Sequence, residues 1–228
     1  DAQRDAVTRI EHDALGRQTR IFDAEGGVER MAYDAFDNKL KYFNKLGGTY
    51  HYIYDAQGRV LKETSPLGSV KRFEYDGFGN RTLQVEAEGR PEQRTTRYQY
   101  DTNNRLIRQT SDALPVYTLD GGEATVSPSQ SWRYDAAGRL YQAKNRYASL
   151  RWIYDPVGNV VEEHHGYSVA GVKETYRWQH EHDPLGNRVA SVRPDGRRVD
   201  ILSYGSGHVH GLLFGQRDIV NLERDKLH

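Results

Sequence analysis

The sequence predicts an all-β protein, built from tandem β-hairpins that form a curved strip of sheet. Three observations predict this class, and the first two are that a six-residue string recurs eight times and that aromatic residues alternate with polar ones before most copies. The third is composition, since 36% of the 228 residues are hydrophobic and the mean hydropathy is -0.86. So polar a chain cannot fill a deep aliphatic core, but its 16 tyrosines can cover one face of a sheet.

The recurring string, called here the tip string, reads aromatic or His, Asp, two variable residues, a turn residue, and Arg or Asn. Its eight copies begin at His12, Tyr33, Tyr54, Tyr75, Tyr100, Tyr134, Tyr154 and His182. The first four begin at positions 12, 33, 54 and 75, a constant step of 21 residues. That step fits two short strands and two turns, so no helix is required.

Two positions of the tip string predict a hairpin tip. The fifth position always holds Gly, Asn or Asp, the residues that tolerate a left-handed backbone. The Asp at the second position can accept hydrogen bonds from downstream backbone N–H groups as an Asx-turn. The predicted structural site residues are therefore Asp13, Gly16, Asp34, Asp55, Gly58, Asp76, Gly79, Asp101, Asn104, Asp135, Gly138, Asp155, Gly158, Asp183 and Gly186.

The residues around the tips predict strands and a second kind of turn. Tyr50, Tyr52 and Tyr54 alternate with polar or aliphatic neighbours, which is the period of a strand. The alternation puts aromatics on a packed face and arginines on a wet face. Turns of the second kind are expected at 44–47, 65–68, 87–89 and 193–196, so that each repeat is two strands and two turns.

The domain organisation follows from where the repeat persists. We expect a repeat region over residues 1–202, interrupted near 111–130 by a long loop or inserted hairpin and near 165–172 by a shorter insertion. Residues 203–228 form a Gly-rich tail whose charged end has no assignable secondary structure. Because the pattern is already under way at Asp1 and stops abruptly at His228, we expect a piece of a longer protein.

Composition also excludes several function classes. The 32 basic and 32 acidic residues cancel, which argues against a nucleic-acid partner. The absence of cysteine removes disulfides, thiol nucleophiles and thiolate metal sites. No apolar stretch approaches the roughly 20 residues that span a bilayer, and no signal peptide is evident.

The tip string resembles the YD repeats of the Rhs family, shared with teneurins and the BC components of insecticidal toxin complexes. The tail, at 204–211 and 223–228, resembles bacterial Rhs proteins in particular. The resemblance implies a β-strip that spirals into a shell around a C-terminal toxic domain. It implies synthesis in the cytoplasm, then export by type VI secretion or a toxin-complex device in interbacterial competition. The implied partners are further Rhs repeats, the toxin domain and a secretion-apparatus spike protein.

The resemblance brings no catalytic residues to this chain. The family's Asp-Pro-x-Gly-Leu and Gly-Gly-x-Asn-x-Tyr elements, which belong to its self-cleaving core, are missing. Asp155-Pro156 and Asp183-Pro184 fall in tip register, where turn chemistry explains them. The segment 205–208, Gly-Ser-Gly-His, lacks the nucleophile elbow and reads as a turn. We therefore expect no enzyme activity, and neither cofactor nor metal.

Two binding functions stay open as alternatives. Histidines at 164–165, 180–182 and 208–210 allow a metal site on one strand face, but their spacing forms no closed ligand set. Arginines beside aromatics, as at 132–134 and 176–178, allow sugar binding. The runner-up function is therefore an extracellular adhesion or carbohydrate-binding module built from the same repeats.

Overall fold

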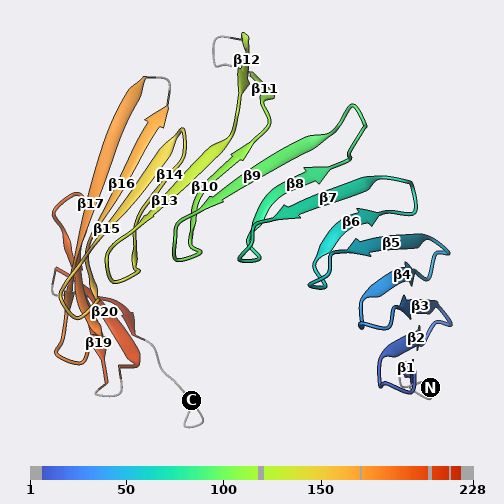
Figure 1. The fold of residues 1–228 in the computed structure, drawn as a ribbon. Helices are drawn as coiled ribbons and strands as arrows, with labels where there is room; N and C mark the ends of the chain where they lie inside the picture. The colour runs from blue at the N-terminus through green and yellow to red at the C-terminus, as the bar shows by residue number, and fades with distance from the viewer. Residues whose placement is uncertain (1–6, 118–120, 170, 205–206, 216, 222–228) are drawn as a thin grey trace. The chain divides into compact units, whose positions relative to one another are not determined.

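The computed structural model describes residues 7–117, 121–169, 171–204, 207–215 and 217–221. These residues form strands joined by turns and short irregular segments, and they contain no helix (Figure 1). None of them therefore belongs to a helix long and apolar enough to cross a membrane. The chain divides into two compact units, residues 1–112 and residues 113–228.

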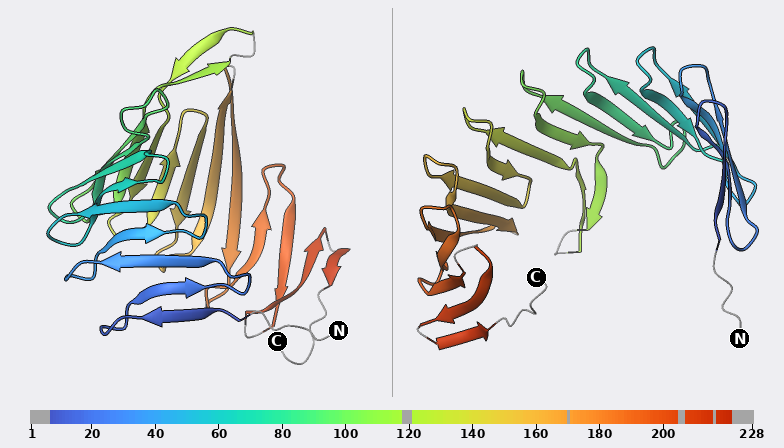
Figure 2. Two further views of the ribbon diagram at one scale, coloured as in Figure 1. Left: turned by 90° about the vertical axis from the view of Figure 1, so that its right-hand side faces the viewer. Right: turned by 90° about the horizontal axis from the view of Figure 1, so that it is seen from below.

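Unit 1, residues 1–112, is an antiparallel meander in which each strand pairs with the next. Figure 2 shows its strand direction turning progressively from β1 to β10, as the right-handed twist of strands requires. The strands are β1 (Arg9–His12), β2 (Gln18–Phe22), β3 (Val28–Tyr33), β4 (Lys39–Phe43), β5 (Thr49–Tyr54), β6 (Val60–Thr64), β7 (Val70–Tyr75), β8 (Arg81–Glu86), β9 (Arg94–Tyr100) and β10 (Leu106–Ser111).

Unit 2, residues 113–228, contains a small hairpin and a second antiparallel meander. The hairpin is formed by β11 (Leu114–Tyr117) and β12 (Glu123–Val126). The meander comprises β13 (Ser129–Tyr134), β14 (Leu140–Lys144), β15 (Ala148–Tyr154), β16 (Val160–Val169), β17 (Val172–His182), β18 (Arg188–Val192), β19 (Arg198–Ser203), β20 (Val209–Phe214) and β21 (Arg217–Asn221).

The two irregular sequence segments have simple structural forms. The segment near 111–130 contains the β11–β12 hairpin. The segment near 165–172 belongs to β16 and β17, which pair as one long hairpin with strands of 10 and 11 residues. The tail supplies β20 and β21. The chain ends named above, 1–6 and 222–228, lie outside the described residues, as do Gly205 and Ser206.

Burial in the described residues is shallow, as expected for a single sheet layer. The only buried hydrophobic side chains among the described residues are Val85, Val126 and Ala190, and the other buried residues are Thr95, His180 and Gly211. Strand alternation separates the two faces: Tyr52 and Trp152 are half-buried, whereas their neighbours Ile53 and Arg151 are exposed. Backbone pairing and half-buried aromatic rings therefore hold each unit together, with little help from a core.

Candidate functional site

The hairpin tips share one backbone conformation. The fifth residue of every tip string has a positive φ, at Gly16 (80°), Asp37 (67°), Gly58 (77°), Gly79 (90°), Asn104 (60°), Gly138 (86°), Gly158 (104°) and Gly186 (84°). In the third tip the Asp55 N–H donates to Arg59 O at 3.0 Å, and a β-bulge follows Ile53 in the ladder. This is the geometry of a hairpin loop that ends in a left-handed residue.

The aspartate of each tip string holds its own turn together. Asp55 Oδ1 accepts the backbone N–H groups of Gln57 at 2.9 Å and Arg59 at 3.0 Å, and Oδ2 accepts Arg59 Nε at 2.6 Å. Where the sixth residue is Asn, its amide replaces the guanidinium: Asn38 Nδ2 donates to Asp34 Oδ2 at 2.9 Å. The N–H of Arg59, and then its side chain, lower the pKa of Asp55 below its usual value.

Three of the arginines at the sixth position, Arg17, Arg59 and Arg139, also reach the next tip. The guanidinium carbon of Arg59 lies 4.8 Å from the centroid of the Tyr75 ring, and its Nη1 donates to Asp76 O at 3.3 Å. Arg17 and Arg139 occupy the equivalent place, at 4.9 and 4.5 Å from their tyrosine rings. Each such arginine therefore closes its own turn and binds the turn of the following repeat.

The tip tyrosines connect each repeat to the preceding one. The Tyr75 hydroxyl donates to Val60 O at 3.0 Å, the carbonyl just after the preceding tip. The same bond is made by Tyr33, Tyr54, Tyr100 and Tyr154, at distances between 2.6 and 3.0 Å. Five rings are thus fixed in one orientation, and successive repeats are joined at their tips as well as through their strands.

Loss of one tyrosine hydroxyl should weaken this connection measurably. We expect Tyr75→Phe to lower the free energy of unfolding by about 1 kcal/mol, because the Val60 carbonyl loses its donor while the ring stays packed. Urea denaturation followed by circular dichroism measures the change. Tyr117→Phe is the matched control because that side chain is 85% exposed, and it should leave stability unchanged. Equal effects of the two substitutions would contradict the role given to the tip hydroxyl.

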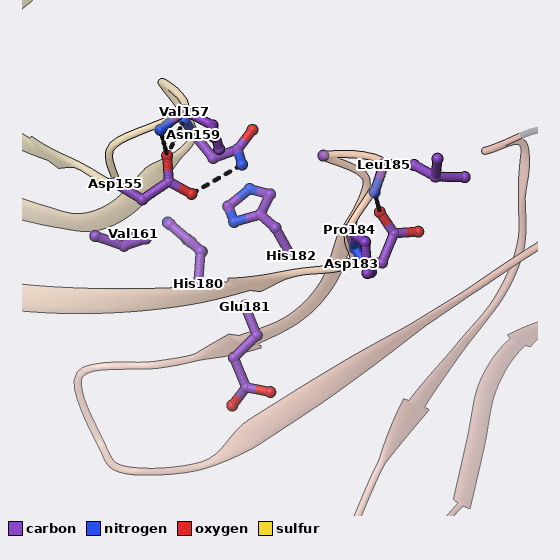
Figure 3. Close-up of a pocket in the computed structure, with 11 residues that line it drawn as sticks. Asp155, Val157, Asn159, Val161, His180, Glu181, His182, Asp183, Pro184 and Leu185 are labelled. Carbon is purple, nitrogen blue, oxygen red and sulfur yellow. Dashed lines mark hydrogen bonds between the residues drawn. The ribbon is translucent and has the colours of Figure 1, made fainter.

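Two tips with Asn at the sixth position leave an open pocket beside the next tip. One pocket, of about 720 Å³, lies between the second and third tips and is lined by residues including Asn38 and Tyr54. The other, of about 740 Å³, lies beside His182, which takes the place of the tip tyrosine. Figure 3 shows the His182 ring next to Asp155 and Asn159. We call these spaces inter-tip pockets.

The predicted histidine groups do not assemble a metal site in the described residues, where no three His, Cys, Asp or Glu side chains are suitably grouped. His180 is buried, with Nδ1 2.9 Å from Ser191 Oγ and Nε2 3.2 Å from Glu163 Oε1. Burial lowers the pKa of His180, so that its neutral form is favoured. His164 and His165 pair instead with glutamates two residues earlier, at 3.0 and 3.1 Å.

Sequence reasoning missed the contacts between tips. Arg17 and Asp34 are 17 residues apart, as are Arg59 and Asp76, so nothing local indicates that one side chain reaches the other's carbonyl. It also missed the turn at Asp23, where Oδ1 accepts the N–H groups of Glu25 and Gly27. That turn repeats the Asp-x-x-Gly signal of the tips, without the preceding tyrosine, and could have been found by it.

The family described as RHS Repeat matches residues 54–91, which run from the third tip through the fourth. The chain thus contains an RHS repeat over residues 54–91. Over 99 residues the chain is 38% identical to the toxin protein Tse5 of Pseudomonas aeruginosa, covering 43% of the chain and 7% of Tse5. Over 133 residues it is 29% identical to double-stranded DNA deaminase toxin A of Burkholderia cenocepacia, covering 58% of the chain and 7% of that protein.

A solved structure shows that the fold itself is shared. The chain superposes on part of the crystal structure of TcdB2-TccC3 without its hypervariable C-terminal region, with a TM-score of 0.54 and 14% sequence identity. The superposition covers 91% of this chain and 12% of that one. The matched stretches are therefore small parts of much longer proteins.

Proposed function

We propose that this chain is a structural segment of an Rhs-type toxin, forming part of a β-shell that encapsulates a C-terminal toxic effector for delivery to competitor or host cells. The observation that supports this proposal is the set of contacts between neighbouring tips. Five tip tyrosines and three tip arginines contact the neighbouring repeat, so a meander of this kind can be extended by adding repeats that make the same contacts.

The physical properties of the repeats suit a wall. A single layer of sheet encloses the largest volume for a given chain length, and very few of the described residues are buried in a core. Strand twist makes a long meander coil. The two curated relatives carry the word toxin in their names, which supports the same role for this chain. Export through a secretion apparatus, with a spike protein as partner, is part of this proposal.

Limited proteolysis of the full-length protein that contains this chain tests the proposal. In the native protein we expect the region after the repeats to resist protease, and to become rapidly digested once mild urea opens the wall. Intact mass under denaturing conditions then shows whether a separate C-terminal fragment was held inside. A C-terminal region that is digested as fast in the native protein as in urea would contradict encapsulation and leave an adhesion or carbohydrate-binding role to be tested on glycans.

A further inference from the structure

The inter-tip pocket between the second and third tips has a counterpart in neighbouring repeats that the protein fills itself. Its lining includes Asp34, Phe36, Asn38, Tyr54 and Asp55. One repeat earlier and one repeat later, the equivalent position carries an arginine whose guanidinium stacks on the next tip's tyrosine. The chain therefore contains its own examples of what this space accepts.

The acceptors of the occupied sites are present in the pocket. Arg17 Nη1 donates to Asp34 O at 2.9 Å and Arg59 Nη1 donates to Asp76 O at 3.3 Å, so the carbonyl of the next tip's aspartate is the shared acceptor. The corresponding carbonyl in the pocket is that of Asp55, which among the described residues accepts only the N–H of Gly58 from its own turn. A carbonyl oxygen has two lone pairs, so it retains capacity for a second donor.

The stacking surface is also in place. Tyr54 is held by the bond from its hydroxyl to Lys39 O at 2.8 Å, the same bond that holds Tyr33 and Tyr75 beneath their arginines. No cation lies over the Tyr54 ring in the part of the chain that the structure describes. The ring therefore presents an unoccupied π-face in the orientation that binds a guanidinium elsewhere in the strip.

The remaining walls suit the rest of an arginine side chain. Asn38, which lines the pocket, donates through Nδ2 to Asp34, and this leaves its Oδ1 as a further acceptor, 3.1 Å from the position that a Cβ on Gly58 would take. Phe36 and Ile53, 85% and 55% exposed, provide apolar surface for a methylene stem. The negative charge of Asp34, whose pKa is lowered by its bond with Asn38, favours a cation.

We propose that the inter-tip pocket at Asn38 and Tyr54 binds an arginine side chain presented by another polypeptide segment. The guanidinium stacks on Tyr54 and donates to the Asp55 carbonyl and to Asn38 Oδ1. A lysine ammonium fits less well, because it has neither the planar face for stacking nor the fixed fork of donors. The pocket beside His182 is not equivalent, since an imidazole there replaces the phenol ring. This proposal does not depend on the shell function.

The test is a titration of the 228-residue chain, with its tyrosine rings labelled with carbon-13, by Nα-acetyl-arginine methylamide. Tyr54→Phe assigns the Tyr54 ring signals among the 16 tyrosines. We expect saturable shifts of the Tyr54 signals with a dissociation constant on the order of millimolar, because the ligand gains one stacked face and two hydrogen bonds. Nα-acetyl-lysine methylamide at equal ionic strength should bind roughly tenfold more weakly.

Two matched substitutions test the site: one should remove the arginine-binding pocket at Tyr54, and the other should create an equivalent pocket at Tyr75. Asn38→Arg supplies an internal guanidinium and should abolish the Tyr54 response, while Arg59→Asn removes one and should make Tyr75 respond to the arginine compound. Both exchanges use residues that this chain already carries at the sixth tip position, and unchanged spectra of the other tyrosines verify the fold. The proposal is overturned if Tyr54 does not shift, shifts equally with the lysine compound, or still responds in Asn38→Arg. It is equally overturned if Tyr75 stays unresponsive in Arg59→Asn.

Discussion

Gly58→Val should lower the free energy of unfolding by about 2–3 kcal/mol, because a left-handed backbone is unfavourable for any residue with a Cβ and most of all for a β-branched one. Gly58 has a φ of 77° at the tip between β5 and β6. A Cβ there would also lie 3.1 Å from Asn38 Oδ1, whose side chain is held by its bond to Asp34. Conformational strain and crowding therefore add.

Urea denaturation of the chain, followed by circular dichroism, measures this effect against two controls. Gly58→Asn should cost much less, since Asn tolerates the left-handed region and already occupies it at Asn104. Gly77→Ala, in the next tip, should be neutral or slightly stabilising: Gly77 is not among the positive-φ residues and has no atom within 4 Å of a Cβ. If Gly58→Val matched Gly77→Ala, the tip would not require a left-handed residue.

Acidification below about pH 4 should weaken all the hairpin tips together. The pKa of each tip aspartate is lowered from 3.8, at Asp13, Asp34, Asp55, Asp76, Asp101, Asp135, Asp155 and Asp183. A carboxylate with a depressed folded pKa contributes stability that is fully present above its unfolded pKa. That contribution is lost as the pH falls through the folded pKa. Because eight carboxylates titrate in the same range, the loss should be steep.

Urea midpoints measured between pH 5.5 and pH 2.5 test this expectation, and Asp55→Asn is the matched variant. An asparagine keeps an acceptor for the N–H groups of Gln57 and Arg59 but cannot titrate and loses the charge on which Arg59 Nε is bound. The variant should therefore be less stable at neutral pH and show a shallower fall in acid. A flat pH profile would show that the tip carboxylates do not stabilise the fold, and a profile identical in the variant would show this for Asp55. Burial also lowers the pKa of His180, so the folded state loses a further contribution to its stability as the pH falls below about 6.5, the unfolded pKa of histidine.

The fold was predictable from the sequence because its determinants are local. The residue types at the fifth tip position limit φ, and alternation of aromatic and polar residues fixes which face each side chain occupies. The same rules were ambiguous for 111–130 and 165–172. There the structure shows a separate hairpin and a lengthened one, because pairing with a partner strand, which no local signal records, decides where a strand stops.

The site was only partly predictable. Aspartates such as Asp55 were expected to cap their own turns, and they do so through bonds to residues two and four positions ahead. The burial of His180 between Glu163 and Ser191 had no sequence signal, since these two neighbours come from two other strands, β16 and β18. The exposure of Phe36 also had no sequence signal, since an apolar side chain is expected to be buried. Phe36 is exposed because it lies in a turn, outside the strands.

By itself, the sequence determined the all-β class, the tip string and its left-handed fifth residue, because these depend on backbone preferences within six residues. Only the tertiary structure decided how repeats are joined. Stacking of Arg59 on Tyr75, and the pocket that remains where Asn38 takes an arginine's place, depend on the spacing of adjacent hairpins in the sheet. That spacing is set by interstrand hydrogen bonds between residues distant in the chain, and so it is encoded in no single repeat.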